Sequence, residues 1–462
     1  MRIAFAAMDS PPGTPGPPAQ GHRLLGLAVA LTLAATLALS FAGKFVCDDG
    51  PRGIWGDNNW CYSDVRNLWD KRGFDVDAVP YAGPPTVGPE TTDGQPPEPY
   101  PVDYVFEYPP GLGFPAWLIA LATTTRTSYF IVSAITLALA AAVTVWQLDV
   151  ALRALRRPRL RLFGLAASPS LVALGMQNWD LWALAPVAAG MAAAVRRKPL
   201  LAAVFFGIGA GIKWWPALLM LPLVVGPWSI PARLRRNGAV AAPAPGTDHR
   251  TLPLRLRLRP VLVFAAVWWA IQVPAIAVSR SGWWAAIAFH LDREPNVASP
   301  VGVIRRAGLL LLPSSFWETP YITLTTVVTF VALGLGLVVI ARRLDAGLLG
   351  PTEACVALVA LFLLTSKVVS VQFLLWLLPI ALLSTLRWRW LLAADVLNVA
   401  VWLLWAPSGD DPNGLLYASL VAAALRTVVM IHVYRTAVQV RHPVESSPHV
   451  ADRPLQPATA PT

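Results

Sequence analysis

The sequence predicts an all-α polytopic membrane protein with about twelve transmembrane helices, from its composition, its apolar segments and the placement of its charges. The 462 residues are 55% hydrophobic and only 14% charged, with a mean hydropathy of +0.53. A soluble protein has roughly 25% charged residues. This composition therefore excludes a water-soluble enzyme and a disordered scaffold.

The apolar segments give the expected spans, since a helix needs about 20 mostly apolar residues to cross a bilayer core. Seven segments approach that length: 24–41, 128–148, 260–278, 321–340, 371–386, 390–406 and 415–433. Five shorter ones complete the twelve: 162–176, 181–195, 200–212, 214–228 and 355–366. No small-residue cleavage site follows the first segment, which is therefore interpreted as a retained span rather than a signal peptide.

The charges support this threading of the chain. With the N-terminus inside, 24 basic and 7 acidic residues fall on the cytoplasmic side, against 12 basic and 18 acidic residues outside. Arginine clusters at 153–161 and 255–259 lie inside, as the positive-inside rule requires. The net charge of +11 thus reflects topology, and nucleic acid is not an expected partner. We expect a multi-pass protein of the plasma membrane with both termini cytoplasmic.

A single transmembrane domain, residues 24–435, is expected between a cytoplasmic N-terminal segment (1–23) and a disordered cytoplasmic tail (436–462). Within it, an outer loop of 85 residues, 43–127, joins the first two spans. Loops of this length usually serve a function. Residues 109–122 of the loop are apolar, but a span there would put the arginine cluster at 153–161 outside. We therefore expect a juxtamembrane or re-entrant helix on the outer face.

The outer loop holds twelve carboxylates, and two of them, Asp64 and Glu107, are set among aromatic residues near the membrane. A carboxylate held against apolar walls can serve as a general base. Asp64 and Glu107 are therefore the candidate catalytic residues. The Asp48–Asp49 pair offers ligands for a divalent cation, but a solvated turn is the favoured interpretation and no cofactor is expected.

Two cysteines of the outer loop, Cys47 and Cys61, lie in a compartment where disulfides persist. A bridge between them would close a loop of about 15 residues and stabilise the fold by about 3 kcal/mol in the chain-entropy model. It would also tether the segment that carries Asp64 to the end of the first span. Two free thiols are the alternative. Cys355 lies in an apolar segment and is expected to serve packing.

Polar residues recur at the expected outer ends of the short spans. Asn178 and Asp180 join the third and fourth spans, Lys213 lies between the fifth and sixth, and Lys367 and Gln372 flank the turn before the tenth. Charged groups at membrane depth usually line a cavity or a pathway. We expect these residues to bind an anionic substrate in an outward-facing cavity. The alternative is that the two lysines only extend to the interface.

Six short motifs occur in an order that resembles one known family. They are Cys61–Asp64, Val79–Tyr81, Glu107–Pro110, Asn178–Asp180, Gly209–Pro216 and Lys367–Pro379. Across roughly residues 24–435 the chain resembles glycosyltransferase family 87 of the GT-C superfamily, which includes polyprenol-phosphate-mannose-dependent α-mannosyltransferases. The sequence departs from the family pattern in a long Pro-rich insert at 82–103 and in Val371, which stands where Pro is expected.

The resemblance implies a GT-C-like fold and a polyprenyl-phosphate sugar as donor. It further implies a glycolipid or glycan acceptor on the outer face and an essential Asp in the first outer loop, whose position matches Asp64. A hexosyl unit, with mannose expected, would be transferred with inversion. Asp64 would act as the base and the two lysines would hold the leaving phosphate. The expected substrate-binding residues are Lys213, Lys367, Asn178, Asp180, Gln372 and Tyr108.

A secondary transporter of an anionic or lipid-linked substrate is the alternative from another class, because buried Lys and Asp side chains also bind ions in transporters. Transporters usually have repeated halves with discontinuous helices near the midplane. Here no internal repeat is found, and the polar residues gather toward the outer side. The sequence therefore favours a membrane glycosyltransferase.

Overall fold

The computed structural model describes residues 19–46, 59–82, 106–226, 228, 254–309, 313–317, 319–408 and 414–439. Every regular element within these ranges is a helix. The predicted cytoplasmic segment 1–23, the tail 436–462 and the Pro-rich insert 82–103 lie largely outside them.

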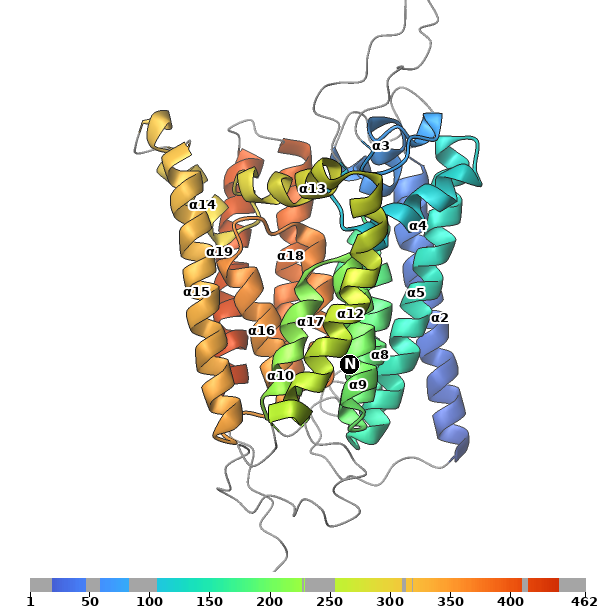
Figure 1. The fold of residues 1–462 in the computed structure, drawn as a ribbon, viewed down its shortest axis with the longest axis vertical. Helices are drawn as coiled ribbons and strands as arrows, with labels where there is room; N and C mark the ends of the chain where they lie inside the picture. Colours follow the sequence, from blue (N-terminus) through green and yellow to red (C-terminus); the bar gives the residue numbers. More distant parts are fainter. Residues whose placement is uncertain are drawn as a thin grey trace, which may run out of the picture.

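Six helices are long and apolar enough to cross a membrane. They are α2 (Ala19–Phe45), α5 (Arg126–Ala154), α12 (Leu254–Val278), α15 (Thr319–Asp345), α18 (Trp388–Ser408) and α19 (Gly414–Gln439). Each coincides with a predicted span, and they run side by side along the bundle (Figure 1). The protein is therefore a helical multi-pass membrane protein. Six candidate spans are found among the described residues, and the count of twelve stays a prediction.

The other predicted spans correspond to shorter helices, three continuous and three broken. The continuous ones are α8 (Asp180–Val195), α9 (Pro199–Ile212) and α16 (Pro351–Thr365). The broken ones are η3 (Arg159–Leu162) with α6 (Phe163–Ala166) and α7 (Pro169–Leu174), η4 (Trp215–Met220) with α10 (Leu221–Val224), and η8 (Val371–Phe373) with α17 (Leu374–Ala381). In the first case the break has a local cause, because the Ser168 hydroxyl accepts the Leu171 N–H and Pro169 follows, so that a new helix begins.

Short helices place polar residues inside the bundle. With 16 and 14 residues, α8 and α9 are about 24 and 21 Å long at 1.5 Å per residue. Both lengths fall short of a hydrocarbon core of about 30 Å. The turns that carry Asp180 and Lys213 therefore lie below the level that the long helices reach.

The elements of the predicted outer loop gather at one end of the bundle, which we call the site end (Figure 1). They are η1 (Asn59–Cys61), α3 (Asp64–Lys71), η2 (Phe74–Val76) and α4 (Pro110–Leu121), and α13 (Arg280–Asp292) lies beside them. The remaining elements are α14 (Pro300–Gly308) and η7 (Ser314–Trp317). α4 confirms the helix predicted at 109–122.

Packing of α4 on α9 fixes the residues that precede α4. A Cβ atom on Gly111 would lie 2.5 Å from the carbonyl oxygen of Gly211, so only glycine allows this close approach. Gly211 is two residues before Lys213, and Gly111 is three residues after Tyr108. The contact therefore brings Tyr108 and Lys213 to one place.

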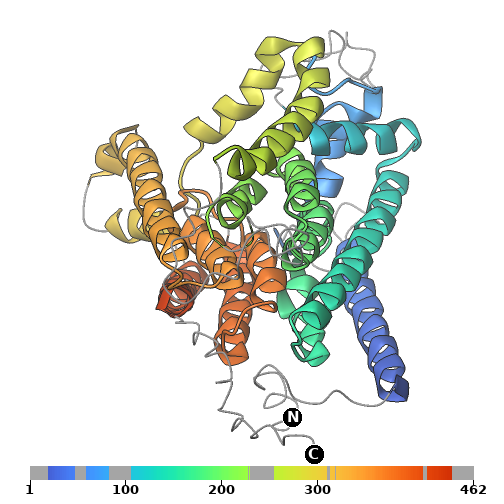
Figure 2. The same ribbon diagram turned by 60° about the horizontal axis from the view of Figure 1, so that its bottom comes forward.

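The bundle consists of two packed groups of helices. In the first group α5 packs on α8, α8 on α9 and α9 on α12. In the second group α19 packs on α18 and α16, and α16 packs on α15; Figure 2 shows this group in orange and red. α17 joins the groups through contacts with both α8 and α16.

Candidate functional site

Lys44, at the last turn of α2, anchors the segment that leads to Asp64. Its buried ammonium group donates to the carbonyl oxygens of Trp60 at 2.7 Å and Tyr62 at 2.8 Å, and it lies 4.5 Å from the centre of the Trp402 ring. Charge-assisted hydrogen bonds of this kind are the stronger ones in proteins. Lys44 thus ties residues 60–62 to α2.

The turn between α7 and α8 anchors the same segment from the other side. The Ser63 hydroxyl donates to the carbonyl oxygen of Met176 at 2.8 Å, and the Asp64 N–H donates to that of Gln177 at 2.8 Å. Asp64 is the first residue of α3, so its backbone N–H has no partner within the helix and is free for this bond. The position of Asp64 is therefore fixed by its backbone as well as by its side chain.

Three donors surround the Asp64 carboxylate, which is 8% exposed. The Tyr62 hydroxyl donates to Oδ1. The Tyr108 hydroxyl donates to Oδ2 at 2.7 Å, and the Asn178 amide donates to the same oxygen. Both carboxylate oxygens act as acceptors, as they do in an ionised carboxylate.

The two sides of the carboxylate differ in exposure. Tyr108, on the Oδ2 side, is 9% exposed, whereas Tyr62, on the Oδ1 side, is 42% exposed. Burial and the nearby Asp64 charge raise the pKa of both hydroxyls, so both are neutral donors at physiological pH. Oδ1 therefore lies on the more exposed side of the carboxylate.

Lys213 lies directly behind this cluster, where α9 ends. Its ammonium group is 3.1 Å from Oδ1 of Asn178, 3.4 Å from Oδ1 of Asp180 and 4.5 Å from the centre of the Tyr108 ring. The bond to Asn178 sets the orientation of that amide, because Lys213 can only donate. The Asn178 nitrogen therefore faces Asp64.

Asp180 balances the charge of Lys213 inside the protein. It is 1% exposed, and its Oδ1 also accepts the indole N–H of Trp376 at 2.8 Å. Its Oδ2 is buried with no hydrogen-bond partner among the described residues. The structure thus joins five of the predicted residues in one network: Asp64, Tyr108, Asn178, Asp180 and Lys213.

Glu107, the other predicted catalytic carboxylate, is engaged elsewhere. Its Oε2 forms an ion pair with Nε of Arg72 at 2.7 Å, and its carbonyl oxygen lies 2.8 Å from Nε2 of His290. Burial lowers the pKa of His290 to about 4, with Arg293 and Lys213 adding to the effect and the Glu107 carbonyl opposing it. His290 is therefore neutral at physiological pH and donates from Nε2, since a carbonyl can only accept.

The two remaining predicted residues contact other groups. The Lys367 ammonium group donates to the carbonyl oxygen of Leu291 and, at 2.9 Å, to the hydroxyl of Thr326. Gln372 is 4% exposed, and its Oε1 has no hydrogen-bond partner within the described chain. Lys367 therefore ties the turn before η8 to α13 and α15.

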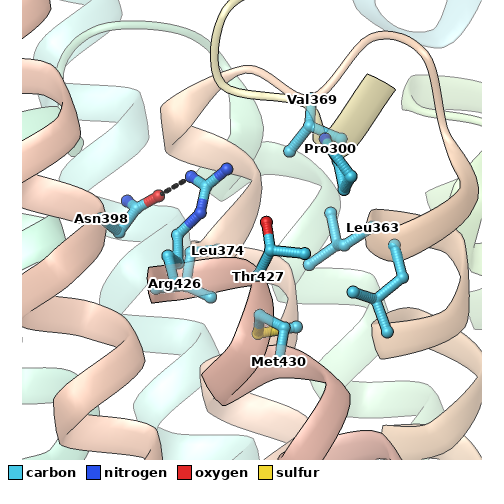
Figure 3. Close-up of a pocket in the computed structure, with 9 residues that line it drawn as sticks. Pro300, Leu363, Val369, Leu374, Asn398, Arg426, Thr427 and Met430 are labelled. Atoms are coloured by element: carbon cyan, nitrogen blue, oxygen red, sulfur yellow. Dashed lines mark hydrogen bonds between the residues drawn. The ribbon is translucent and has the colours of Figure 1, made fainter. Parts of the chain in front are cut away.

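Sequence reasoning missed a buried polar group on α18 and α19 (Figure 3). Arg426 donates to Oδ1 of Asn398 at 2.6 Å and to the carbonyl oxygen of Ala298, and Asn398 donates to that of Val371 at 2.7 Å. These bonds hold the segment before α14 and the start of η8, which follows Lys367. A charged residue in the middle of an apolar segment was the available signal, since charges at membrane depth are rarely unpaired.

Sequence reasoning also missed Lys44, Tyr62, Arg72 and His290. Tyr62 lies within the first motif, two residues before Asp64, and could have been found there. The others act through contacts between distant parts of the chain that no local pattern shows.

The predicted disulfide and cation site fall partly outside the described residues. Cys61 is disulfide-bonded, and Cys355 is a free, buried cysteine, as expected. Cys47 and the Asp48–Asp49 pair lie outside the described residues, so the pairing of Cys61 with Cys47 stays a prediction. Within the described part of the chain, no three His, Cys, Asp or Glu side chains gather to hold a metal ion.

Comparison with known proteins identifies the family. The sequence model of glycosyltransferase family 87 matches residues 106–247, which include Tyr108, Asn178, Asp180 and Lys213. The match confirms the resemblance found from the motifs and supports glycosyltransferase family 87, a family of GT-C-type membrane glycosyltransferases. No curated protein matches the chain.

Proposed function

We propose that this protein is a family 87 glycosyltransferase that transfers a hexosyl unit, with mannose expected, from a polyprenyl-phosphate sugar to a glycolipid or glycan acceptor. The single observation that carries the proposal is the Asp64 carboxylate, held by three donors beside the Lys213 ammonium group. A base and a cation at one place are what transfer from a sugar phosphate requires.

Asp64 is the base in this mechanism. The acceptor hydroxyl takes the place of the Tyr62 hydroxyl at Oδ1, while Tyr108 and Asn178 keep Oδ2 in position. The acceptor oxygen then attacks the anomeric carbon as its proton passes to Oδ1, which is general base catalysis worth about 10²- to 10⁴-fold. A single displacement of this kind inverts the configuration at the anomeric carbon.

Lys213 is the main cation for the leaving phosphate. The bond between the anomeric carbon and the phosphate oxygen breaks, its electron pair goes to the phosphate, and the growing negative charge strengthens the attraction to Lys213. Arg293 can add to this field, because it is exposed and lies near enough to lower the pKa of Tyr62. Lys367 supports the site by holding the carbonyl of Leu291, two residues before Arg293.

Glu107 is the second candidate base. Its ion pair with Arg72 would have to open before it could accept a proton, which favours Asp64. The proposed reaction uses no metal ion or other cofactor.

The proposed setting is the outer face of the plasma membrane, with both termini cytoplasmic. The arginines of the 153–161 cluster lie where α5 ends, and Arg126 begins α5 at the site end. This separation of the site from the basic cluster along a 29-residue helix supports a site on the outer side.

The test is transfer by the purified protein reconstituted in lipid. A radiolabelled polyprenyl-phosphate mannose and the matching nucleotide sugar are supplied separately, with a membrane extract as acceptor. We expect label in acceptor material from the lipid-linked donor and none from the nucleotide sugar. Movement of an intact lipid-linked donor across the membrane without any covalent transfer would instead support a secondary transporter.

A further inference from the structure

Tyr62 is the donor at the more exposed oxygen of the Asp64 carboxylate. Its hydroxyl donates to Oδ1, whereas the buried Tyr108 and Asn178 side chains both donate to Oδ2. In the proposed reaction Oδ1 is the oxygen that accepts the proton of the nucleophile. The Tyr62 hydroxyl therefore occupies the place at which a nucleophile must lie.

The backbone of Tyr62 is anchored, although the residue itself is 42% exposed. The Lys44 ammonium group holds the carbonyl oxygen of Tyr62 at 2.8 Å. The next residue, Ser63, donates its hydroxyl to the carbonyl oxygen of Met176 at 2.8 Å. Rotation about the side-chain bonds is therefore the freedom that Tyr62 keeps. Such a rotation uncovers Oδ1 and leaves α2, α3 and the turn before α8 in place.

The Tyr62 hydroxyl keeps its own proton in this position. Partial burial and the neighbouring Asp64 and Glu107 carboxylates raise the pKa of Tyr62, and Arg293 opposes them. Tyr62 therefore stays a neutral hydroxyl and cannot take the proton of a nucleophile itself. Its bond to Asp64 is a hydrogen bond to a charged group, which is stronger than one between neutral groups.

A base that activates an acceptor hydroxyl can also activate water. The water oxygen would attack the anomeric carbon, and its proton would pass to Oδ1 of Asp64. The bond from that carbon to the phosphate oxygen would break, with its electron pair going to the phosphate. The products would be a free sugar and a polyprenyl phosphate, so the donor would be lost. Enzymes exclude water from their sites to prevent side reactions of this kind.

We propose that Tyr62 is a specificity-determining residue, which keeps water from Oδ1 until the acceptor displaces its hydroxyl. This role rests on the proposed function. Water at Oδ1 gains one hydrogen bond to the carboxylate and loses the one that Tyr62 makes, so it has no net advantage there. An acceptor glycan makes further contacts with the protein, and their binding energy offsets the loss of the Tyr62 bond. The site thereby selects the acceptor over water.

The experiment follows both fates of a radiolabelled polyprenyl-phosphate mannose with the full chain reconstituted in lipid, namely release of free sugar and transfer to acceptor in a membrane extract. Tyr62→Phe keeps the ring and removes the hydroxyl. The ratio of hydrolysis to transfer should therefore rise at least about tenfold, the effect of one hydrogen bond to a charged group. Tyr417→Phe, the same change at a residue of α19 that is 43% exposed, is the matched control and should keep the wild-type ratio.

A second readout needs no turnover. A water-soluble carbodiimide couples an amine to accessible carboxylates, and peptide mapping gives the rate at Asp64 relative to Asp77, an exposed loop residue. Tyr62→Phe should raise this relative rate at least about fivefold, because the hydroxyl that covers Oδ1 is gone.

An unchanged ratio of hydrolysis to transfer in Tyr62→Phe, or an unchanged rate of Asp64 modification, would overturn the role of Tyr62. Absence of transfer by the wild type would instead overturn the proposed function. The carbodiimide result would still decide whether Tyr62 shields Asp64, so the two failures are distinguishable.

Discussion

Replacing Lys213 by Met, together with a compensating change at Asp180, separates two roles of this lysine. Met keeps the apolar stem of the side chain and removes its charge. In the structure the ammonium group pairs with Asp180 at 3.4 Å and orients Asn178 at 3.1 Å. The single substitution should therefore affect both the stability of the fold and the binding of an anionic donor.

The magnitude follows from the burial of Asp180. This carboxylate is 1% exposed, and Trp376 is its other hydrogen-bond donor. Removing one partner of a buried ion pair typically costs about 3–5 kcal/mol, because the other charge stays buried without compensation. We expect Lys213→Met to lower the free energy of unfolding by about this amount. Adding Asp180→Asn removes the unpaired charge and should restore most of it.

The assay compares thermal unfolding and donor affinity in the wild type, in Lys213→Met and in the double variant. If Lys213 also holds the donor phosphate, the double variant should be stable yet bind the polyprenyl-phosphate sugar at least tenfold more weakly, the loss of one charge-assisted contact. Normal donor affinity in the stable double variant would refute a phosphate-binding role. Lys213 would then serve only to balance Asp180 and orient Asn178.

Three further predictions concern pH, the disulfide and the topology. Because the pKa of His290 is lowered to about 4 in the folded protein, its contribution to stability is full above about pH 6.5 and falls as the pH drops toward 4. His290→Gln should therefore reduce the loss of melting temperature between pH 7 and pH 5, and an unchanged loss would contradict this. Peptide mapping without reductant should recover Cys47 and Cys61 as one linked species; two alkylated thiols would argue against the bridge. A cysteine introduced in place of Asp57 should be labelled from outside, and one in place of Arg157 only from inside. Labelling of position 157 from outside would overturn the topology.

Much of the fold could be predicted from the sequence because apolar segments of membrane length carry a strong signal. All six long helices and α4 lie where the sequence predicts them. The breaks within 162–176, 214–228 and 371–386 were not predicted. Pro169 and Pro216 lie within the first two of these segments. Hydropathy averaged over a whole segment does not show where one short helix ends and the next begins.

The sequence predicted which residues belong to the candidate site better than it predicted which of them contact one another. Asn178, Asp180 and Lys213 were found because polar residues at the ends of short apolar segments are rare and costly. Asp64 lies beside these residues because Lys44 bonds to Trp60 and the Asp64 N–H bonds to the carbonyl oxygen of Gln177. Both bonds join residues that are far apart in the chain, so no local pattern predicts them. The grouping of Lys367 with Lys213 as phosphate ligands rested on similar depth and stays a prediction; the structure shows Lys367 bonded to Leu291 and Thr326.

Turnover by Asp64→Asn in purified, folded protein tests the central claim most directly. Asn keeps the size of the side chain and removes its capacity to accept a proton. Transfer from the polyprenyl-phosphate sugar should fall at least about 100-fold, within the range for general bases, while the donor still binds. Asp77→Asn is the matched control, because Asp77 is an exposed loop residue with a φ of 57° that Asn also adopts; it should transfer normally. Near-normal transfer by Asp64→Asn would contradict the account, and Glu107 would become the residue to test next.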